Sequence, residues 1–160
     1  SGCQTASMDR RDCLSFNVAS EKTMPIPKVI PIRWMDDLHT AHVGECKGGN
    51  QFFLAHHRVP VSGGQEHLDY VALYRFRQDG RAITPDIRRL PDSGAEEEVK
   101  SLLLRQLGEH ERHDIKVAPF QFAHDGHTFG LIPDSQQETL TLEPGSMITF
   151  MEPWDGEYFT

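Results

Sequence analysis

A period of two along residues 70–77 is the clearest pattern in the chain. One set of alternating positions holds Tyr70, Ala72, Tyr74 and Phe76, and the other holds Val71, Leu73, Arg75 and Arg77. Because successive side chains of a strand point to opposite faces, this alternation predicts a strand with one better-buried face. Asp79-Gly80 follows, and this dipeptide favours a two-residue hairpin turn. We therefore expect a return strand over residues 81–90, with Pro85 placing it at a sheet edge.

A helical period replaces the alternation over residues 95–107. The apolar stripe consists of Val99, Leu102, Leu103 and Leu107. Ser93 and Glu96 have the spacing of a capping box, and Gly108 is well placed to end the helix. This helix is expected to cover one face of a sheet.

Further strands are predicted before and after these elements. Residues 51–55 form a short apolar run typical of a buried strand. Residues 117–123 and 128–132 flank Asp125-Gly126, and residues 140–142 and 147–151 flank Pro144-Gly145, so two more hairpins are expected. The predicted fold class is α+β, a single domain with a mostly antiparallel sheet of hairpins and one covering helix.

The length of 160 residues fits one domain with a sizeable core. Residues 1–23 are polar with few apolar anchors, which predicts a flexible N-terminal arm. Residues 24–160 are expected to form the domain. Three prolines within residues 24–31 favour an extended lead-in or an edge strand at its start.

The net charge and its distribution along the chain indicate which kinds of macromolecule the protein binds. The formal net charge of -8 argues against a nucleic-acid binder, which needs a clustered basic face. Residues 117–160 contain no Lys or Arg, yet they hold Asp125, Asp134, Glu138, Glu143, Glu152, Asp155 and Glu157. These charges must face water, the rest of the chain or a basic partner, so we expect a basic protein partner.

Localisation is predicted from apolar runs and cysteines. No apolar run approaches the roughly 18 residues of a membrane span. The three cysteines are an odd number, which favours free thiols in the cytoplasm. Ser1-Gly2-Cys3 also resembles the end of a bacterial lipoprotein signal, so a lipid anchor through Cys3 is the alternative.

Histidine and cysteine provide two candidate metal sites. His39, His42 and Cys46 lie within eight residues, and Cys13 is a possible fourth zinc ligand, although a polar loop explains the same residues. His124 and His127 flank a predicted two-residue turn and would be cross-strand neighbours, as ordinary polar hairpin residues also would be. The adjacent His56 and His57 should point to opposite faces of a strand, which makes them a poor ligand pair. Zinc is thus the one cofactor considered, and none is required.

No catalytic residue is predicted. The chain lacks a Gly-x-Ser-x-Gly elbow, a phosphate-binding glycine loop and Gly-x-Gly-x-x-Gly, so the usual sequence motifs for acyl transfer, phosphoryl transfer and dinucleotide chemistry are missing.

The last residues are the candidate partner-binding site. They combine two large aromatic residues with three acids: Glu152, Trp154, Asp155, Glu157 and Tyr158. Tyrosine and tryptophan are common interface anchors, which favours a recognition loop. The alternative is that Trp154 and Tyr158 pack on the sheet and close the core, leaving the acids exposed.

Several motifs resemble a group of small bacterial proteins often labelled formate hydrogenlyase regulatory proteins. They occupy residues 49–53 (GNQFF), 74–81 (YRFRQDGR), 118–132 and 153–158 (PWDGEY), so the resemblance spans about residues 49–160. It implies a shared fold and a regulatory role, with no catalytic residues to transfer. Phe159 stands where we expect an acidic residue in that group.

Two functional hypotheses follow. The first is a non-enzymatic bacterial binding protein, an immunity-type inhibitor or a regulator, that engages a basic protein partner through its acidic C-terminal surface. The second is a metal-binding protein or metal-dependent enzyme that uses one of the His/Cys groups. The sequence does not determine the oligomeric state.

Overall fold

The computed structural model describes residues 26–61 and 66–160. The expected N-terminal arm, residues 1–23, lies outside these residues. The first strands are β1 (Ile30–Ile32), β2 (Val43–Cys46), β3 (Gln51–Pro60), β4 (His67–Phe76) and β5 (Ala82–Arg89). The 3-10 turn η2 (Ser93–Ala95) and the helix α2 (Glu96–Gln106) come next. The remaining strands are β6 (His110–Arg112), β7 (Ile115–Val117), β8 (Phe120–His124), β9 (His127–Asp134), β10 (Thr139–Glu143) and β11 (Thr149–Phe150).

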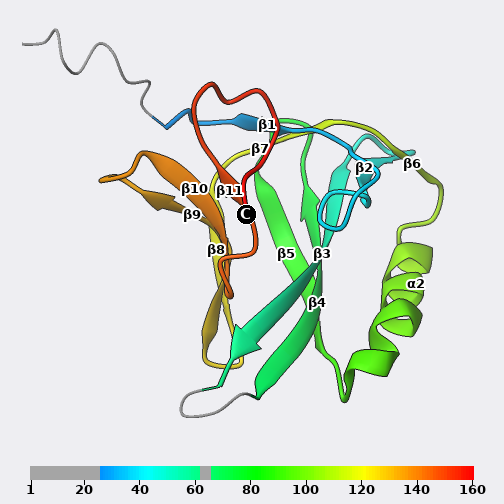
Figure 1. The fold of residues 1–160 in the computed structure, drawn as a ribbon. Coiled ribbons are helices and arrows are strands. Elements are labelled where there is room, and N and C mark those ends of the chain that lie inside the picture. Colours follow the sequence, from blue (N-terminus) through cyan, green and yellow to red (C-terminus); the bar gives the residue numbers. More distant parts are fainter. Residues whose placement is uncertain (1–25, 62–65) are drawn as a thin grey trace, which may run out of the picture.

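The strands form three antiparallel sheets. One has five strands in the order β5-β4-β3-β2-β6, one has four in the order β11-β10-β9-β8, and β1 pairs with β7 in a third. Figure 1 shows α2 on one side of the five-stranded sheet and β8 to β11 on the other. The predicted α+β class, with a mostly antiparallel sheet and one covering helix, is confirmed.

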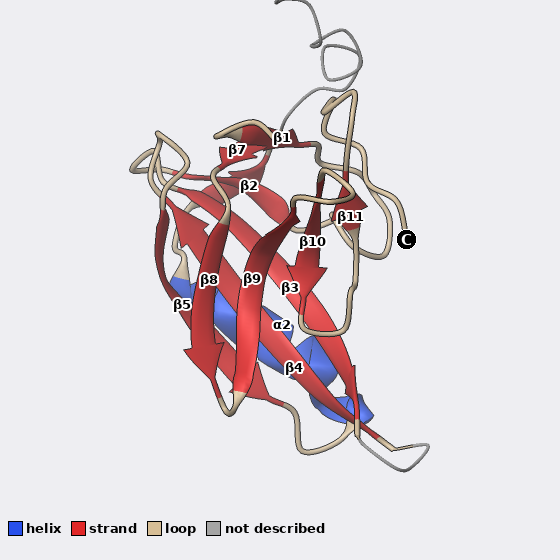
Figure 2. Cartoon of the chain, turned by 90° about the vertical axis from the view of Figure 1, so that its left-hand side faces the viewer, coloured by secondary structure: helices blue, strands red, loops and turns tan. Residues whose placement is uncertain are grey.

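The main core lies between the two larger sheets. In Figure 2 the strands β8, β9 and β10 lie in front of the five-stranded sheet, with α2 behind it. Tyr70, Tyr74 and Phe76 of β4 pack in the same buried cluster as Phe129 and Leu131 of β9. One alternating face of β4 therefore points between the sheets, as the period of two predicts.

A smaller core lies between the five-stranded sheet and α2. It contains Phe52, Leu54, Val71 and Leu73 from the sheet and Leu103 from the helix. The second face of β4 is thus also buried as far as Leu73, because the helix covers it. The sequence predicted the helix, but it did not predict that the helix would bury Val71 and Leu73 on this face of β4.

The packed stripe of α2 differs from the predicted one. Leu103 is buried, and Val99, Leu104 and Leu107 pack against the same cluster, whereas Leu102 is exposed. The sheet therefore meets the side of the helix that carries Leu104. The inclusion of Leu102 in the buried stripe was wrong.

The start of the helix also differs from the prediction. The chain enters α2 through η2, and Ala95, not the predicted Ser93, occupies the N-cap position of the helix, without a side-chain cap. Glu96 instead pairs with Lys100 one turn later, at 2.7 Å between Oε2 and Nζ. At the other end, Gly108 has the expected left-handed backbone, with φ of 74°.

The predicted hairpins are present, but their strands and turns differ from the prediction. The strand expected over residues 117–123 is divided between the end of β7 and β8, which lie in different sheets, and β11 is shorter than the predicted residues 147–151. β5 is an edge strand, as Pro85 indicated, but residues 77–81 join it to β4 where a two-residue turn was expected. Gly80 has φ of 95°, and a side chain there would lie 3.1 Å from the main-chain oxygen of Lys116, which explains the glycine. In the β8–β9 hairpin, His124 pairs with His127 across a two-residue turn, as predicted.

Candidate functional site

Residues 117–160 fold into one layer of the molecule, which we call the acidic layer. They contain the last residue of β7, the strands β8 to β11 and the C-terminal segment. In Figure 1, β8 to β11 lie on the left, and the red C-terminal segment extends from them to the middle of the view. The segment holds seven of the 24 acidic residues and none of the 16 basic ones, so it carries -7 of the formal net charge of -8. The charge asymmetry of the sequence thus becomes an asymmetry in space.

Several acids of this layer are hydrogen-bonded to uncharged groups. Asp134 accepts from the N–H of Gln136 at 3.0 Å, and Glu143 accepts from the N–H of Ser146 at 2.9 Å. Such bonds orient a carboxylate but leave its negative charge in place. An open hollow of about 430 Å³ lies beside them, lined by Ile132, Pro133, Asp134, Ser135, Gln136, Thr141 and Glu143.

Asp125 has a different role from the other acids. It lies in the β8–β9 turn and accepts a hydrogen bond from the Tyr70 hydroxyl, with 2.6 Å between the oxygens. Burial, together with this bond, raises the pKa of Tyr70 to about 12. The contact joins the acidic layer to β4, so we assign Asp125 to the structure of the fold.

Residues 152–160, which we call the tail, are anchored by Trp154. Its side chain belongs to the main core, and the residue is only 8% exposed. Its backbone is left-handed, with φ of 59°, and its N–H donates to the Met151 carbonyl at 2.9 Å. The indole nitrogen has no hydrogen-bond acceptor among the described residues. Trp154 therefore holds the tail in place.

The tail is joined to residues 33–41, which we call the 33–41 loop. The Arg33 N–H donates to the Gly156 carbonyl at 3.0 Å, and the Arg33 guanidinium pairs with Glu157 at 2.9 Å. A side chain at Gly156, where φ is 93°, would lie 2.4 Å from Arg33 Cγ, so this crossing requires glycine.

Asp37 connects the loop and the tail. One of its oxygens accepts from the N–H groups of His39 and Thr40, at 3.1 and 2.9 Å, and the other accepts from the Tyr158 hydroxyl at 2.7 Å. Burial alone would raise the pKa of Asp37, but the hydrogen bonds from Thr40 and Tyr158 outweigh it and lower this pKa. Burial and the bond to Asp37 raise the pKa of Tyr158 to about 12. The loop and the tail therefore form a single structured surface.

These contacts divide the five candidate partner-binding residues. Glu152, Asp155 and Glu157 are exposed, Tyr158 is partly buried, and Trp154 is buried. The packing alternative considered from the sequence thus describes the two aromatic residues. The Trp154 side chain fills the core beneath the surface that the acids occupy, which is the position that the packing alternative gives it.

Comparisons with known protein families, curated proteins and solved structures give no match. The site is therefore interpreted from its own geometry. Among the described residues, no helix is both long enough and apolar enough to cross a membrane.

The residues of the first candidate metal group, His39, His42 and Cys46, lie in different environments. The His39 ring packs against Tyr158 at 5.4 Å between centroids, while Cys46 lies in β2 opposite His110 of β6. Burial raises the pKa of the Cys46 thiol and lowers the pKa of His42. Cys13 lies outside the described residues.

The second candidate pair, His124 and His127, faces Tyr70. The two rings lie 6.4 and 5.9 Å from the Tyr70 ring in edge-on arrangements. Throughout residues 26–61 and 66–160, no three His, Cys, Asp or Glu side chains are grouped as a metal site requires. The cross-strand pairing was therefore predicted correctly, whereas zinc binding has no geometric support within this part of the chain.

His57 forms a buried polar group that sequence analysis did not assign. His56 and His57 point to opposite faces of β3, as predicted, and His57 is fully buried in the main core. Its Nδ1 donates to the Pro144 carbonyl at 3.0 Å, so Nε2 accepts from the Tyr74 hydroxyl at 2.7 Å. Burial lowers the pKa of His57 to about 4, which keeps the ring neutral. The bond to Pro144 ties β3 to the acidic layer.

His56 belongs to a charged cluster on the helix side of the sheet. Its Nε2 lies 2.8 Å from Asp69, and its Nδ1 lies 3.5 Å from Glu96 at the start of α2. Arg58 also contacts Asp69, at 3.2 Å. The sequence pattern does not indicate this cluster, although the opposed positions of Arg58 and Asp69 on β3 and β4 follow from the hairpin register.

A cavity of about 300 Å³ adjoins this cluster, lined by Leu38, His39, His56, Arg58, Glu96 and Met147. The cluster brings opposite charges together: Asp69 contacts His56 and Arg58, while Glu96 contacts Lys100 and His56. No serine, threonine or cysteine lines this cavity. We interpret the cluster as the attachment of α2 to the sheet.

Proposed function

We propose that this chain is a non-enzymatic binding protein, an immunity-type inhibitor or a regulator, that engages a basic protein partner through the acidic layer. The supporting observation is that the segment without Lys or Arg forms one side of the molecule and carries nearly all of its net charge. A surface of one sign attracts a partner of the opposite sign over several ångströms and accelerates the encounter. We place this activity in the cytoplasm, where the free thiol of Cys46 would remain reduced.

The tail is the part of this layer best suited to contact the partner. Glu152, Asp155 and Glu157 are exposed, and their backbone is fixed by buried Trp154 beneath them and by the contacts of Arg33. A rigid surface loses little conformational entropy when it binds. The acids therefore act as a fixed pattern of charge.

The proposal is tested by affinity capture from a bacterial lysate at low and high salt, followed by measurements with the captured protein in purified form. We expect a basic protein that is released at high salt, because screening weakens contacts between exposed charges. The variant that replaces Asp134 and Asp155 with Lys should bind it at least about tenfold more weakly, chiefly through slower association.

The matched control replaces Glu98 of α2 and Glu111 of β6 with Lys, which changes the net charge equally outside the acidic layer. It should bind the partner almost as tightly as the wild type. Equal loss in both variants would mean that only total charge matters, and capture of an acidic partner would refute the proposal. Thermal melting must first show that both variants are folded.

A further inference from the structure

We propose that the 33–41 loop and the tail form one composite docking surface for an apolar side chain flanked by Lys or Arg residues of a protein partner. The inference rests on the proposed function and adds the apolar half of the contact. Trp34, Leu38 and Phe159 supply the apolar area, and the surrounding acids supply the rim.

Exposed apolar residues are concentrated on these two segments. Three of the six large apolar residues exposed in the described part of the chain lie here: Trp34 at 37%, Leu38 at 84% and Phe159 at 51%. Single exposed apolar residues are ordinary, but several on one surface are typical of an interaction site. Leu38 has the highest exposure of the six.

The contacts between loop and tail join the two segments that carry these apolar residues. Trp34 follows Arg33, which binds Gly156 and Glu157. Leu38 lies between Asp37 and His39, both of which contact Tyr158, and Phe159 follows Tyr158. Each apolar residue is thus next in sequence to a residue that joins the two segments.

The apolar residues are held by a fixed backbone. The Trp34 N–H donates to Asp114 at 2.8 Å, and its indole N–H donates to the Ala41 carbonyl at 3.0 Å. The hydrogen bonds of Asp37 fix the turn that carries Leu38, and Phe159 exchanges two main-chain hydrogen bonds with Thr149. An anchor that is already ordered binds with a smaller entropic cost.

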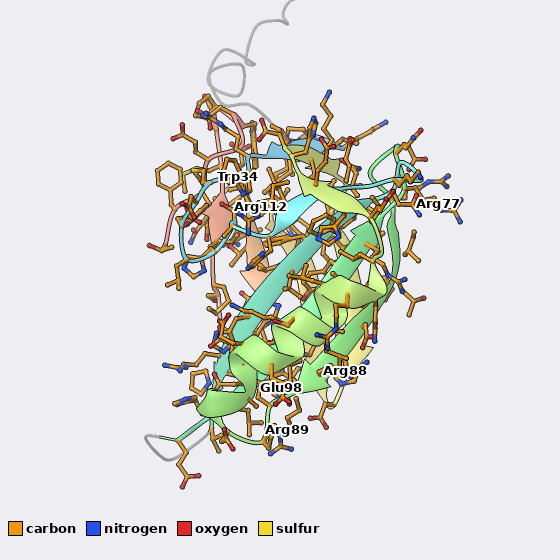
Figure 3. All side chains as sticks on the ribbon, turned by 90° about the vertical axis from the view of Figure 1, so that its right-hand side faces the viewer. Trp34, Arg77, Arg88, Arg89, Glu98 and Arg112 are labelled. Carbon is orange, nitrogen blue, oxygen red and sulfur yellow. The ribbon has the colours of Figure 1, made fainter. Side chains whose placement is uncertain are left out.

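The charges around the apolar residues indicate the partner. Asp36, Glu152, Asp155 and Glu157 are exposed on the same two segments. Of the arginines near these residues, Arg33 is paired with Glu157, and Arg58, which lines a cavity with Leu38, is paired with Asp69. Interfaces commonly have an apolar centre and a polar rim of complementary charge. In Figure 3, Trp34 lies at the opposite end of the molecule from Arg88 and Arg89, and Arg112 of β6 is labelled beside Trp34. The complement is therefore an apolar residue with Lys or Arg beside it.

A second copy of this chain is the competing occupant. In a twofold-symmetric dimer the same surface meets itself, so the acids of both copies would face each other. Like charges in contact oppose association, and a heterologous basic partner avoids this repulsion. We therefore commit to the basic partner.

The test uses a phage-displayed library of random peptides selected on the full-length chain. A synthetic copy of an enriched peptide is then titrated against wild type, Leu38→Ser, Leu102→Ser and Asp155→Lys by fluorescence anisotropy. Leu102 is an exposed leucine on α2, outside the docking surface, and serves as the matched control. Thermal melting establishes that each variant is folded, and size-exclusion chromatography with light scattering gives the oligomeric state.

We expect enriched peptides with an apolar residue beside Lys or Arg. Leu38→Ser and Asp155→Lys should each weaken binding by about tenfold, while Leu102→Ser leaves it unchanged. Loss with Asp155→Lys but not with Leu38→Ser would overturn this inference and leave the proposed function standing. No enriched peptide, equal binding to all variants, or a dimer dissociated by Leu38→Ser would also overturn it.

Discussion

Single residues hold the acidic layer against the rest of the molecule. Asp37 binds the loop and the tail, Tyr70 binds Asp125, and His57 binds Pro144. Each of these bonds joins residues far apart in the sequence, so no local pattern indicates them. Asp37 lies in a segment whose composition is typical of a loop, and no local pattern distinguishes Asp37 from its neighbours. Its role depends on the distant Tyr158.

His57 should make stability depend on pH. Its pKa is about 4 in the folded protein and about 6.5 when exposed, so the unfolded chain binds a proton that the folded chain excludes. The free energy of unfolding should therefore fall as the pH drops from about 6.5 to about 4, by up to about 3 kcal/mol from this residue. Urea denaturation across this range measures the effect.

The control for this prediction removes the buried polar pair. His57→Leu alone leaves the Tyr74 hydroxyl without its acceptor and should destabilise the protein by about 2 to 4 kcal/mol. His57→Leu combined with Tyr74→Phe should recover part of this loss and show a flatter pH profile. An unchanged profile in the double variant would show that other groups cause the dependence.

Tyr158→Phe tests the contact between tail and loop. The change deletes one hydrogen bond to a carboxylate and leaves the ring in place, so we expect a loss of about 1 kcal/mol. Hydrogen exchange of the 33–41 amides should accelerate while exchange in β3 and β4 stays the same. Uniform acceleration throughout the protein would contradict a local role for this bond.

The helices and strands that could be predicted from the sequence are those with a strong local pattern. The alternation in β4, the helical period of α2 and the turn of the β8–β9 hairpin were all identified. The short strands β2, β6 and β7 were not, because they contain only three or four residues. β6 and β7 pair with strands far away in the sequence, and β2 pairs both with the neighbouring β3 and with the distant β6. Such pairings depend on tertiary structure.

The helix stripe shows where local pattern is insufficient. Leu102 and Leu104 flank Leu103, and the sequence does not indicate which of them faces the sheet. In the structure Leu104 packs against the smaller core and Leu102 is exposed. The candidate site also combines predictable and unpredictable parts. The composition of the last residues identified its acids, whereas the packing of Trp154 into the core was one of two alternatives.

Leucine substitutions in α2 test the corrected stripe. Leu103→Ala removes a fully buried side chain and should cost about 2 to 4 kcal/mol. Leu102→Ala, on the same helix and with the same change in composition, should cost less than about 0.5 kcal/mol. Equal losses in the free energy of unfolding, measured by urea denaturation, would mean that α2 packs on the sheet with a different side from the one that carries Leu103 and Leu104.

At the level of the whole molecule, the fold separates a scaffold from a charged layer. The five-stranded sheet has α2 on one face and the acidic layer on the other, with a core on each side. Nearly all of the net charge lies in one of these layers. This separation connects the fold to the proposed binding function, because it gives the protein a single charged side to present.

The central claim is that the acidic layer attracts a basic partner, and the association rate constant as a function of ionic strength tests it most directly. Stopped-flow measurements with the captured partner should give a rate that falls steeply with salt for the wild type. The slope should be clearly shallower for the variant that replaces Asp134 and Asp155 with Lys, and nearly unchanged for the variant that replaces Glu98 and Glu111. A wild-type rate that does not depend on salt, or the same slope in all three proteins, would contradict the account.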